Sequence, residues 1–412
     1  MLHQSCRQLK AIQIEYPNTE IFTNFLGLLS TPQPYWSTDL AAFQNLQSLT
    51  LNQIGGNLRA WQAHIVKILL QSPTLKELSL SLCAMAIYVG HFASIYDVLY
   101  FDRLCDSYAK AGGAPLKLRS LKCGQAMMPM SLASLVKLTD LQYLEEADIC
   151  NRNVAFRGEE IHSFYPTGQF TVNNISSGIA YEAFGPKHSP NLRRLSIHRY
   201  GPDVGGLLFT IADDKVHSRR LALCVGGLGA PNSTDPAAFF TPNPGRRGLH
   251  MQLRMFAVEV SRRRLEDLIL SEALGTGRPS ILDMIASSTA DSLEGLAVHM
   301  LDEPGHEWAT KFLRMSVLES ALGKLPRLTQ LLFNPFVADK LGQHMSPGVV
   351  FAAHRLAAAG PALAYIGMYR QFWRVNRHPS DGSPFQLEAL EEKEWREVEL
   401  FEMASWNYDH PE

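Results

Sequence analysis

The segment HMLDEPGHE contains the densest group of side chains that could bind a metal ion or transfer a proton. These side chains are His299, Asp302, Glu303, His306 and Glu307. The segment lacks the two histidines four residues apart that a zincin helix supplies, and its Pro-Gly pair would interrupt a helix here. We interpret it as a solvated loop without a metal. An enzymatic function would require an activity that depends on His299 or His306.

The sequence shows no other catalytic signature. VGGLGAP lacks the spacing of a phosphate-binding G-x-G-x-x-G loop, and no Gly-x-Ser-x-Gly context marks a nucleophile. The cysteines, at positions 6, 83, 105, 123, 150 and 224, form no C-x-x-C pair and are expected to be reduced thiols. We therefore expect a non-catalytic protein that needs no cofactor.

Composition and charge describe a folded domain without a polyanionic partner. The chain is 46% hydrophobic and 19% charged, with a net charge of −2, which points to neither nucleic acid nor a membrane surface. No apolar run approaches the roughly 18–20 residues of a membrane span, and the N-terminus has no signal-peptide core. We expect an intracellular protein, cytoplasmic or nuclear.

The positions that would hold functional side chains follow from a repeated spacing, L-x-x-L-x-L, with other apolar residues allowed. A step of three followed by a step of two fits neither a helix nor a continuous strand, and it predicts a turn and then a short strand. The clear copies begin at Leu9, Leu46, Leu75, Leu118, Leu192, Leu265, Leu293, Leu328 and Leu363. Weaker copies are Leu144-Ala147-Ile149 and Leu221-Leu223.

Helical periodicity separates these predicted strands. One apolar stripe consists of Leu58, Trp61, Ile65, Ile68 and Leu69, and another of Trp308, Phe312, Met315 and Leu322. Several neighbouring copies lie 26 to 29 residues apart, the length of one strand–loop–helix–loop unit. Units that each bury one face must stack on one another, which predicts an α/β solenoid.

The repeats resemble those of leucine-rich-repeat proteins of the irregular, ribonuclease-inhibitor-like kind. This resemblance implies a right-handed horseshoe with parallel strands on the concave face and helices on the convex face. The segment ALAYIGMYRQFWRVNRHPSDGSPFQLEALEEKEWREVELF is similar to the end of fungal F-box/leucine-rich-repeat proteins. In these proteins, degenerate repeats end in a strand with an aromatic hairpin and a charged terminal segment.

The narrower resemblance implies a protein–protein interaction module, the substrate-recognition part of an F-box subunit of a cullin–RING (SCF-type) ubiquitin ligase. The alternative is a repeat scaffold or regulatory binding protein without a ligase role. The F-box helices that bind the Skp adaptor do not precede Leu9 in this sequence. We expect adaptor and cullin binding only if an upstream segment supplies them.

The predicted organisation is a solenoid over residues 1–375 and a charged capping segment over 376–412. Long insertions are expected at 151–190 and 225–249, either as surface loops or as loops that hold a partner. Their aromatic residues are Phe164, Tyr165, Phe170, Phe239 and Phe240. The capping segment is predicted to be a helix with an apolar side formed by Leu387, Leu390, Trp395, Val398 and Phe401.

The side chains between the leucines of each strand should face away from the core, on the concave surface. This surface is the candidate site for a protein ligand. Its candidate residues are Glu77, Lys122, Glu146, Asp148, Arg194, His198, Asp267, His299, Asn334, Tyr365 and Tyr369. Small polar positions such as Ser196 share the face and fit a solvated sheet equally well. Phe372 and Trp373 could be interface anchors or core of the last hairpin.

Overall fold

The computed structural model describes fourteen stretches of the chain in enough detail for analysis. These are residues 9–15, 43–54, 58–82, 100–124, 127, 129–150, 180–197, 202–228, 252–260, 281–300, 315–334, 347–368, 371–379 and 382–404. None of the helices in these ranges combines the length and the apolar character that a membrane crossing requires.

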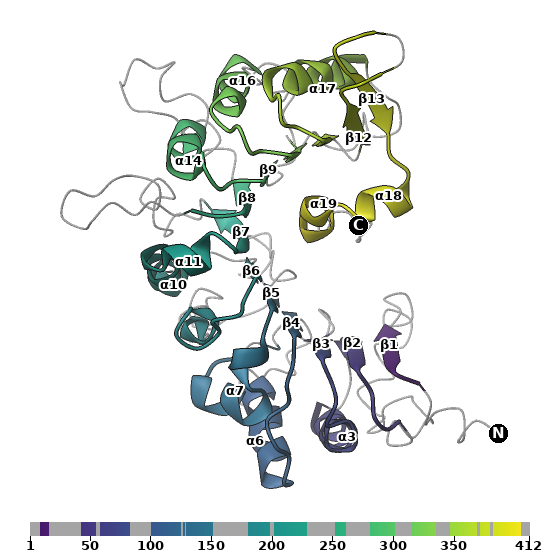
Figure 1. The fold of residues 1–412 in the computed structure, drawn as a ribbon. Helices are drawn as coiled ribbons and strands as arrows, with labels where there is room; N and C mark the ends of the chain where they lie inside the picture. The colour runs from purple at the N-terminus through teal and green to yellow at the C-terminus, as the bar shows by residue number, and fades with distance from the viewer. Residues whose placement is uncertain are drawn as a thin grey trace, which may run out of the picture. The chain divides into compact units, whose positions relative to one another are not determined.

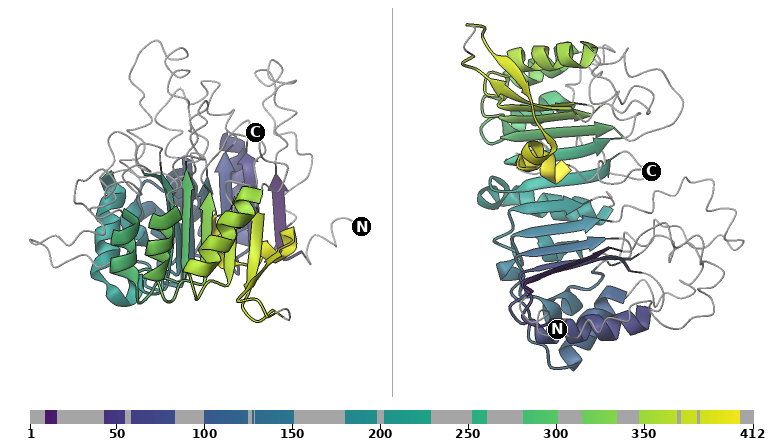
Figure 2. Two further views of the ribbon diagram at one scale, coloured as in Figure 1. Left: turned by 90° about the horizontal axis from the view of Figure 1, so that it is seen from above. Right: turned by 90° about the vertical axis from the view of Figure 1, so that its right-hand side faces the viewer.

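The protein is α/β, with an open sheet of 13 strands whose order follows the chain from β1 to β13. Most neighbouring strands run parallel (Figure 2). The chain divides into two compact units, Met1–Leu195 (unit 1) and Ser196–Glu412 (unit 2).

Unit 1 pairs its strands in parallel and covers one face of them with helices (Figure 1). The strands are β1 (Ala11–Glu15), β2 (Ser48–Ile54), β3 (Glu77–Leu82), β4 (Ser120–Gly124), β5 (Glu146–Cys150) and the start of β6 (Arg194–Ile197). The helices are α3 (Leu58–Gln71), α6 (Tyr100–Lys110) and α7 (Leu132–Leu138), with 3₁₀ turns at Leu141–Tyr143 and Tyr181–Phe184.

The repeated leucines occupy the predicted positions. Leu75 lies in the turn, where its N–H donates to the Ser72 carbonyl at 3.1 Å, while Leu78 and Leu80 alternate along β3. All three are at most 1% exposed. The strand register places Leu78 beside Leu49 and Leu121, so successive copies form continuous buried rows. The weaker copy at residues 144–149 is confirmed by the same register.

The helix stripe predicted after β2 is also confirmed. Trp61, Ile65, Ile68 and Leu69 of α3 are buried at 3% exposure or less. The second predicted stripe begins outside the described residues, but its last member, Leu322, is buried in unit 2.

Asp102 in α6 fixes the start of the next helix from a buried position. Its Oδ1 accepts hydrogen bonds from the N–H groups of Met130 and Ser131, at 3.1 and 3.3 Å, just before α7 begins. Desolvation by burial is the main cause that raises the pKa of Asp102. The carboxylate therefore accepts two stabilising hydrogen bonds, but partial loss of its hydration makes its charged form less stable.

The end of the first predicted insertion is folded. The 3₁₀ turn Tyr181–Phe184 buries both of its aromatic rings, and the Ala180 N–H donates to the Pro129 carbonyl at 2.9 Å. The prediction of a loop up to residue 190 is therefore wrong over its last part, because these aromatic residues belong to the core of unit 1. The aromatic residues proposed to hold a partner lie outside the described residues.

Unit 2 continues the pattern and ends in an antiparallel hairpin. Its parallel strands are β7 (Ala222–Leu228), β8 (Met255–Val260), β9 (Gly295–Met300), β10 (Gln330–Asn334) and β11 (Tyr365–Met368). Strands β12 (Gln371–Asn376) and β13 (Gln386–Ala389) follow in antiparallel pairing. Its helices are α10 (Pro202–Asp213), α11 (Lys215–Ser218), α14 (Ile281–Thr289), α16 (Met315–Gly323), α17 (Pro347–Ala359), α18 (Glu392–Arg396) and α19 (Glu399–Ala404).

Two strands of unit 2 differ from the predicted positions. The register aligns Leu223 and Val225 of β7 with Phe256 and Val258 of β8, so the weak copy at Leu221-Leu223 is shifted by two residues. Strand β7 also includes residues 225–228, which were predicted to begin the second insertion. The strand β8 was missed, although Leu253, Phe256 and Val258 keep the same spacing with apolar residues in place of the second and third leucines. The copy predicted at Leu265 lies outside the described residues.

The charged terminal segment is not one helix. Leu387 lies in β13, which pairs with β12, and the helices α18 and α19 begin only at Glu392. Directly after β12, the guanidinium of Arg377 donates to the carbonyls of Ala357, Gly360 and Leu363 at 3.1, 2.6 and 3.3 Å, so it caps the end of α17.

We expect Leu80→Asp to lower the free energy of unfolding by several kcal/mol, because it buries a carboxylate without a partner. Ser79→Asp is the matched control, since Ser79 is half-buried on the other face and the change should cost under about 1 kcal/mol. Urea unfolding followed by circular dichroism measures both. Equal losses from the two substitutions would contradict the assigned facing of β3.

A carboxyl pKa that lies higher in the folded than in the unfolded state means that ionisation costs stability, and this cost is fully present above the folded pKa. Asp102→Asn removes the charge and retains the accepting oxygen, so near pH 8 its free energy of unfolding should equal or exceed that of the wild type. Asp102→Ala leaves two N–H groups without their acceptor and should lose about 1–3 kcal/mol. Urea unfolding near pH 8 and near pH 5 checks the order, and the advantage of the asparagine variant should shrink at the lower pH.

Candidate functional site

The predicted site residues of unit 1 lie together on the sheet face opposite α3, α6 and α7, which we call the polar face. Glu77, Lys122, Glu146, Asp148 and Arg194 occupy the positions between the buried residues of β3 to β6. Small polar residues fill the rest of the face: Ser48, Thr50, Asn52, Ser79, Ser81 and Ser120. The alternation predicted for these strands is therefore confirmed in unit 1.

The strand register fixes which charges are neighbours. Lys122 pairs with Ser79 on one side and Asp148 on the other, and Ser120 separates Glu77 from Glu146. Neighbouring strands lie about 4.8 Å apart. Lys122 and Asp148 are therefore adjacent in one row, and the Glu77 and Glu146 carboxylates lie about 10 Å apart in the next row.

Arg194 extends the row of the two glutamates. The N–H groups of Arg193 and Arg194 both donate to the Glu145 carbonyl, at 2.8 and 3.1 Å. The N–H groups of Glu145 and Glu146 donate to Arg119 in the same way, both at 2.8 Å. Arg194 therefore occupies the same position in β6 as Glu146 in β5 and Ser120 in β4. The row that contains the two glutamates ends in a cation.

Three of the charges on the polar face, those of Glu77, Lys122 and Glu146, remain available to a ligand. Glu77 and Lys122 are exposed, and Glu146, Asp148 and Arg194 are half-buried. Within the described ranges, the side chains of Glu77, Lys122 and Glu146 form no hydrogen bond or ion pair. Asn52 differs, because its Oδ1 accepts from the hydroxyls of Ser79 and Ser81 at 3.3 and 3.5 Å. The face offers salt bridges and hydrogen bonds to a partner surface.

The described part of the chain shows no candidate metal site, and Cys105 and Cys123 in it are buried. Three or more His, Cys, Asp or Glu side chains that could share a metal ion are not found among the described residues. The thiols of Cys105 and Cys123 are buried, and burial raises the pKa of both well above the usual range. Neither thiol is a nucleophile in this state.

In unit 2 the corresponding face is apolar and covered, contrary to the prediction of a continuous open surface. Ala222 and Cys224 of β7, Ala257 of β8, Ala297 of β9 and Leu332 of β10 occupy the positions that carry charges in unit 1. Helix α19 packs on β8, β9 and β10 (Figure 1). We call residues 392–404, which contain α18 and α19, the C-terminal strap. The strap covers the face of β8, β9 and β10, whereas the sequence predicted a segment that caps the end of the repeats.

Phe372 of the last hairpin belongs to this covered core, and Trp373, the next residue of β12, is buried on the opposite face of the sheet. Phe372 stacks on Trp395 of the strap with ring centroids 4.7 Å apart and lies 4.8 Å from Phe401. Trp373 is 4% exposed, and Tyr365 is half-buried against the same cluster. The core interpretation of Phe372 and Trp373 is confirmed, and Tyr365 supports the core. Ser196, predicted on the open face, is 4% exposed.

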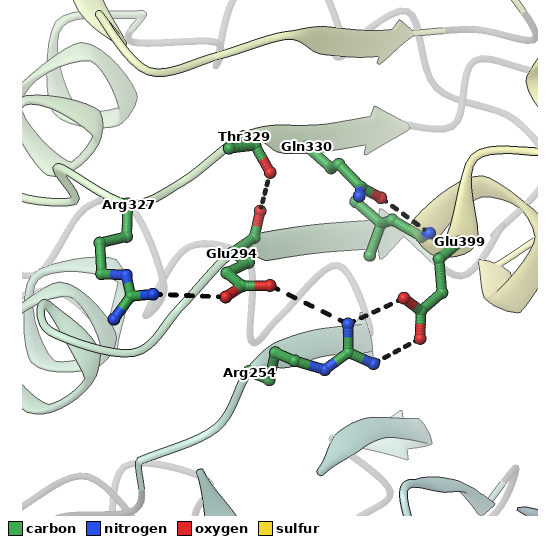
Figure 3. Close-up of polar contacts among 7 residues, drawn as sticks. Arg254, Glu294, Arg327, Thr329, Gln330 and Glu399 are labelled. Carbon is green, nitrogen blue, oxygen red and sulfur yellow. Dashed lines mark hydrogen bonds and ion pairs between the residues drawn. The ribbon is translucent and has the colours of Figure 1, made fainter. Parts of the chain in front are cut away.

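Arg254 and Glu399 join the strap to the sheet (Figure 3). Arg254, just before β8, forms a bidentate pair with Glu399, in which Nη1 lies 2.8 Å from Oε2. Glu294 lies 4.0 Å from Arg254 and 3.6 Å from Arg327. The Leu400 N–H donates to Gln330 Oε1 at 2.9 Å. The hydrogen bond that Arg254 donates to Glu399 is the main cause that raises the pKa of Arg254.

Sequence reasoning missed Arg254 and Glu399, although a signal for the cover was present. The stretches ALCV, MFAV, GLAV and QLLF lack alternation and are small or apolar at almost every position. Continuous apolar strands indicate a sheet that is buried on both faces. The stretches SLTL, ELSL and SLKC alternate polar and apolar residues, which predicts that one face of their strands is exposed to solvent.

The remaining predicted site residues are not placed as side chains. His198, Asp267 and Tyr369 lie outside the described residues, as does most of the segment with the acidic and histidine cluster. His299 and Asn334 pair with each other in the register of β9 and β10, and their side chains are not described.

The contrast between the two faces can be tested with one type of substitution. Ala297→Lys places an ammonium group beneath α19 and should lower the local stability of β9 by several kcal/mol. Thr50→Lys, on the polar face, should change the stability of β2 by less than about 0.5 kcal/mol. Native-state hydrogen exchange of the β9 and β2 amides reports each effect. A lysine at 297 that is tolerated while the amides of α19 keep their protection would show that the strap does not cover β9.

No protein-family model matches the chain, and no curated protein matches it significantly either.

Proposed function

We propose that this protein is a leucine-rich-repeat solenoid that binds another protein through the polar face of unit 1. The repeat interpretation is supported by the coincidence of L-x-x-L-x-L copies with parallel strands and of helical stripes with the helices between them. Each such unit buries one strand face and one helix stripe against its neighbours, as solenoid repeats do.

The single observation that carries the proposal is the contrast between the sheet faces. In unit 2 the second face is apolar and covered by the chain itself, whereas in unit 1 it carries five charged side chains that no described segment covers. The mixture of Glu77, Glu146 and Asp148 with Lys122 and Arg194 disfavours a polyanion, because phosphates need a cationic surface. It suits a protein surface with complementary charges.

The more specific role that we propose is substrate recognition for an SCF-type ubiquitin ligase, which rests on the resemblance of the terminal segment to F-box/leucine-rich-repeat proteins. A scaffold without ligase partners would use the same face. The presence of the Skp adaptor and a cullin among captured proteins separates the two roles, provided that the longest in-frame chain is used.

Affinity capture from the source cells tests the binding face. Lys122→Glu reverses one charge in the centre of the polar face and should weaken a specific partner at least tenfold. Lys67→Glu is the matched control, because Lys67 is an exposed lysine on α3, which covers the opposite face of the sheet. Quantitative mass spectrometry compares the captured proteins.

A partner that is lost with Lys122→Glu and with Glu77→Lys, and retained with Lys67→Glu, supports the proposal. Identical sets of captured proteins for all four chains contradict it. Loss of partners from the Lys67→Glu variant alone would place the interface on the helices.

A further inference from the structure

The C-terminal strap of unit 2 has little structure of its own. Helices α18 and α19 have five and six residues, far shorter than a helix that is stable alone in water. The strap is therefore ordered by the sheet face below it and by the contacts that join it to this face.

The sheet surface beneath the strap is apolar, and we call it the bed. Its floor consists of small or flexible side chains, Ala222, Cys224, Met255, Ala257, Ala297 and Leu332. Gly295 adds to it, because a Cβ there would lie 3.1 Å from Met255 and 3.4 Å from Leu400 of the strap. A floor of small residues lets a helix approach the strands closely, and large residues on that helix then fill the space.

The strap supplies those large residues from one side. Trp395, Val398, Leu400, Phe401 and Met403 are at most 8% exposed and pack on the floor. Glu392, Lys393, Arg396 and Glu402 are exposed on its outer side. The bed therefore binds an amphipathic helical segment that presents aromatic and long apolar side chains.

The polar connection between strap and sheet is reachable by solvent. Arg254 is 24% exposed and Glu399 is 40% exposed in their side chains. An ion pair in this position is weakened by salt, unlike the apolar contacts around it. The Arg254–Glu399 pair is thus a salt-sensitive connection in a contact that is otherwise apolar, and we call this pair the latch.

We propose that the strap is a releasable cover and that the face of β7–β10 beneath it is a second interaction surface, for a partner's amphipathic helix with Trp, Phe or Leu on one side. The Arg254–Glu399 pair holds the cover closed. A partner helix of the strap's own chemistry competes with the strap for this bed. The proposal concerns unit 2 and stands or falls independently of partner binding on the polar face of unit 1.

The thiol of Cys224 reports opening of the strap in the full chain. It is fully buried in the floor, so alkylation requires that the cover leave. Glu399→Gln breaks the latch and should raise the alkylation rate of Cys224, measured by mass spectrometry, about tenfold. Glu397→Gln is the matched control, since Glu397 is an exposed residue of the same strap, and it should leave the rate unchanged. Salt at about 1 M should accelerate the wild type and not the Glu399→Gln variant.

Local opening is distinguished from unfolding by two further readouts. The alkylation rates of Cys105 and Cys123, and the amide exchange of β9 and β10, should stay at wild-type values in the Glu399→Gln variant. An increase of these rates in parallel with that of Cys224 overturns the proposal, as does an unchanged Cys224 rate. The double variant Arg254→Gln/Glu399→Gln should be no faster than either single variant, because both remove the same pair.

A synthetic peptide with the sequence of residues 390–404 tests the second surface. Added to the Glu399→Gln variant, it should slow Cys224 alkylation at least twofold, because it occupies the bed whenever the strap leaves. The same peptide with serine in place of Trp395, Leu400 and Phe401 should have no effect. Equal protection by the two peptides, or protection by neither, contradicts an apolar helix-binding surface.

Discussion

The in-register parallel pairing of short strands is the constraint from which the rest of this structure follows. Because neighbouring strands align residue by residue, each side-chain position forms a row across several repeats. One set of rows is apolar throughout and is buried beneath the helices. The other set can be polar or apolar, and its character decides whether the sheet keeps a free face or must be covered.

Much of the fold could be predicted because the spacing of apolar residues over a few positions determines where each turn and strand begins. The turn leucine and the two strand residues after it recur in SPTLKELSL, GKLPRLTQLLF and GPALAYIGM, and the strands begin where this spacing predicts. Strand β8 was missed although Leu253, Phe256 and Val258 keep the spacing with apolar substitutes. Strand β7 was misplaced because Leu221, Leu223 and Val225 offer two registers of the same parity. The spacing identifies a strand's facing more firmly than its ends.

The functional surface was predictable only in unit 1. There the alternation of polar and apolar residues is sufficient, because no other element within the described ranges competes for the face. In unit 2, Arg254 and Glu399 are separated by 145 positions, and no periodicity connects residues so distant. The loss of alternation in β7 to β10 indicates that something covers these strands, but the segment that does so is decided by tertiary packing. This is why Tyr365 and Phe372, which resemble interface anchors in the sequence, proved to support or form a core.

The contact of α19 with three successive strands has a consequence for how such a chain can change its length. Gaining or losing one repeat between β8 and β10 would move Gln330 relative to Arg254 by a full strand spacing, and the strap could no longer reach both anchors. A duplication among β2 to β5 meets no comparable obstacle, because no described segment spans those strands on the polar side. Growth and divergence of repeat number are thus permitted in the first unit and restricted in the second.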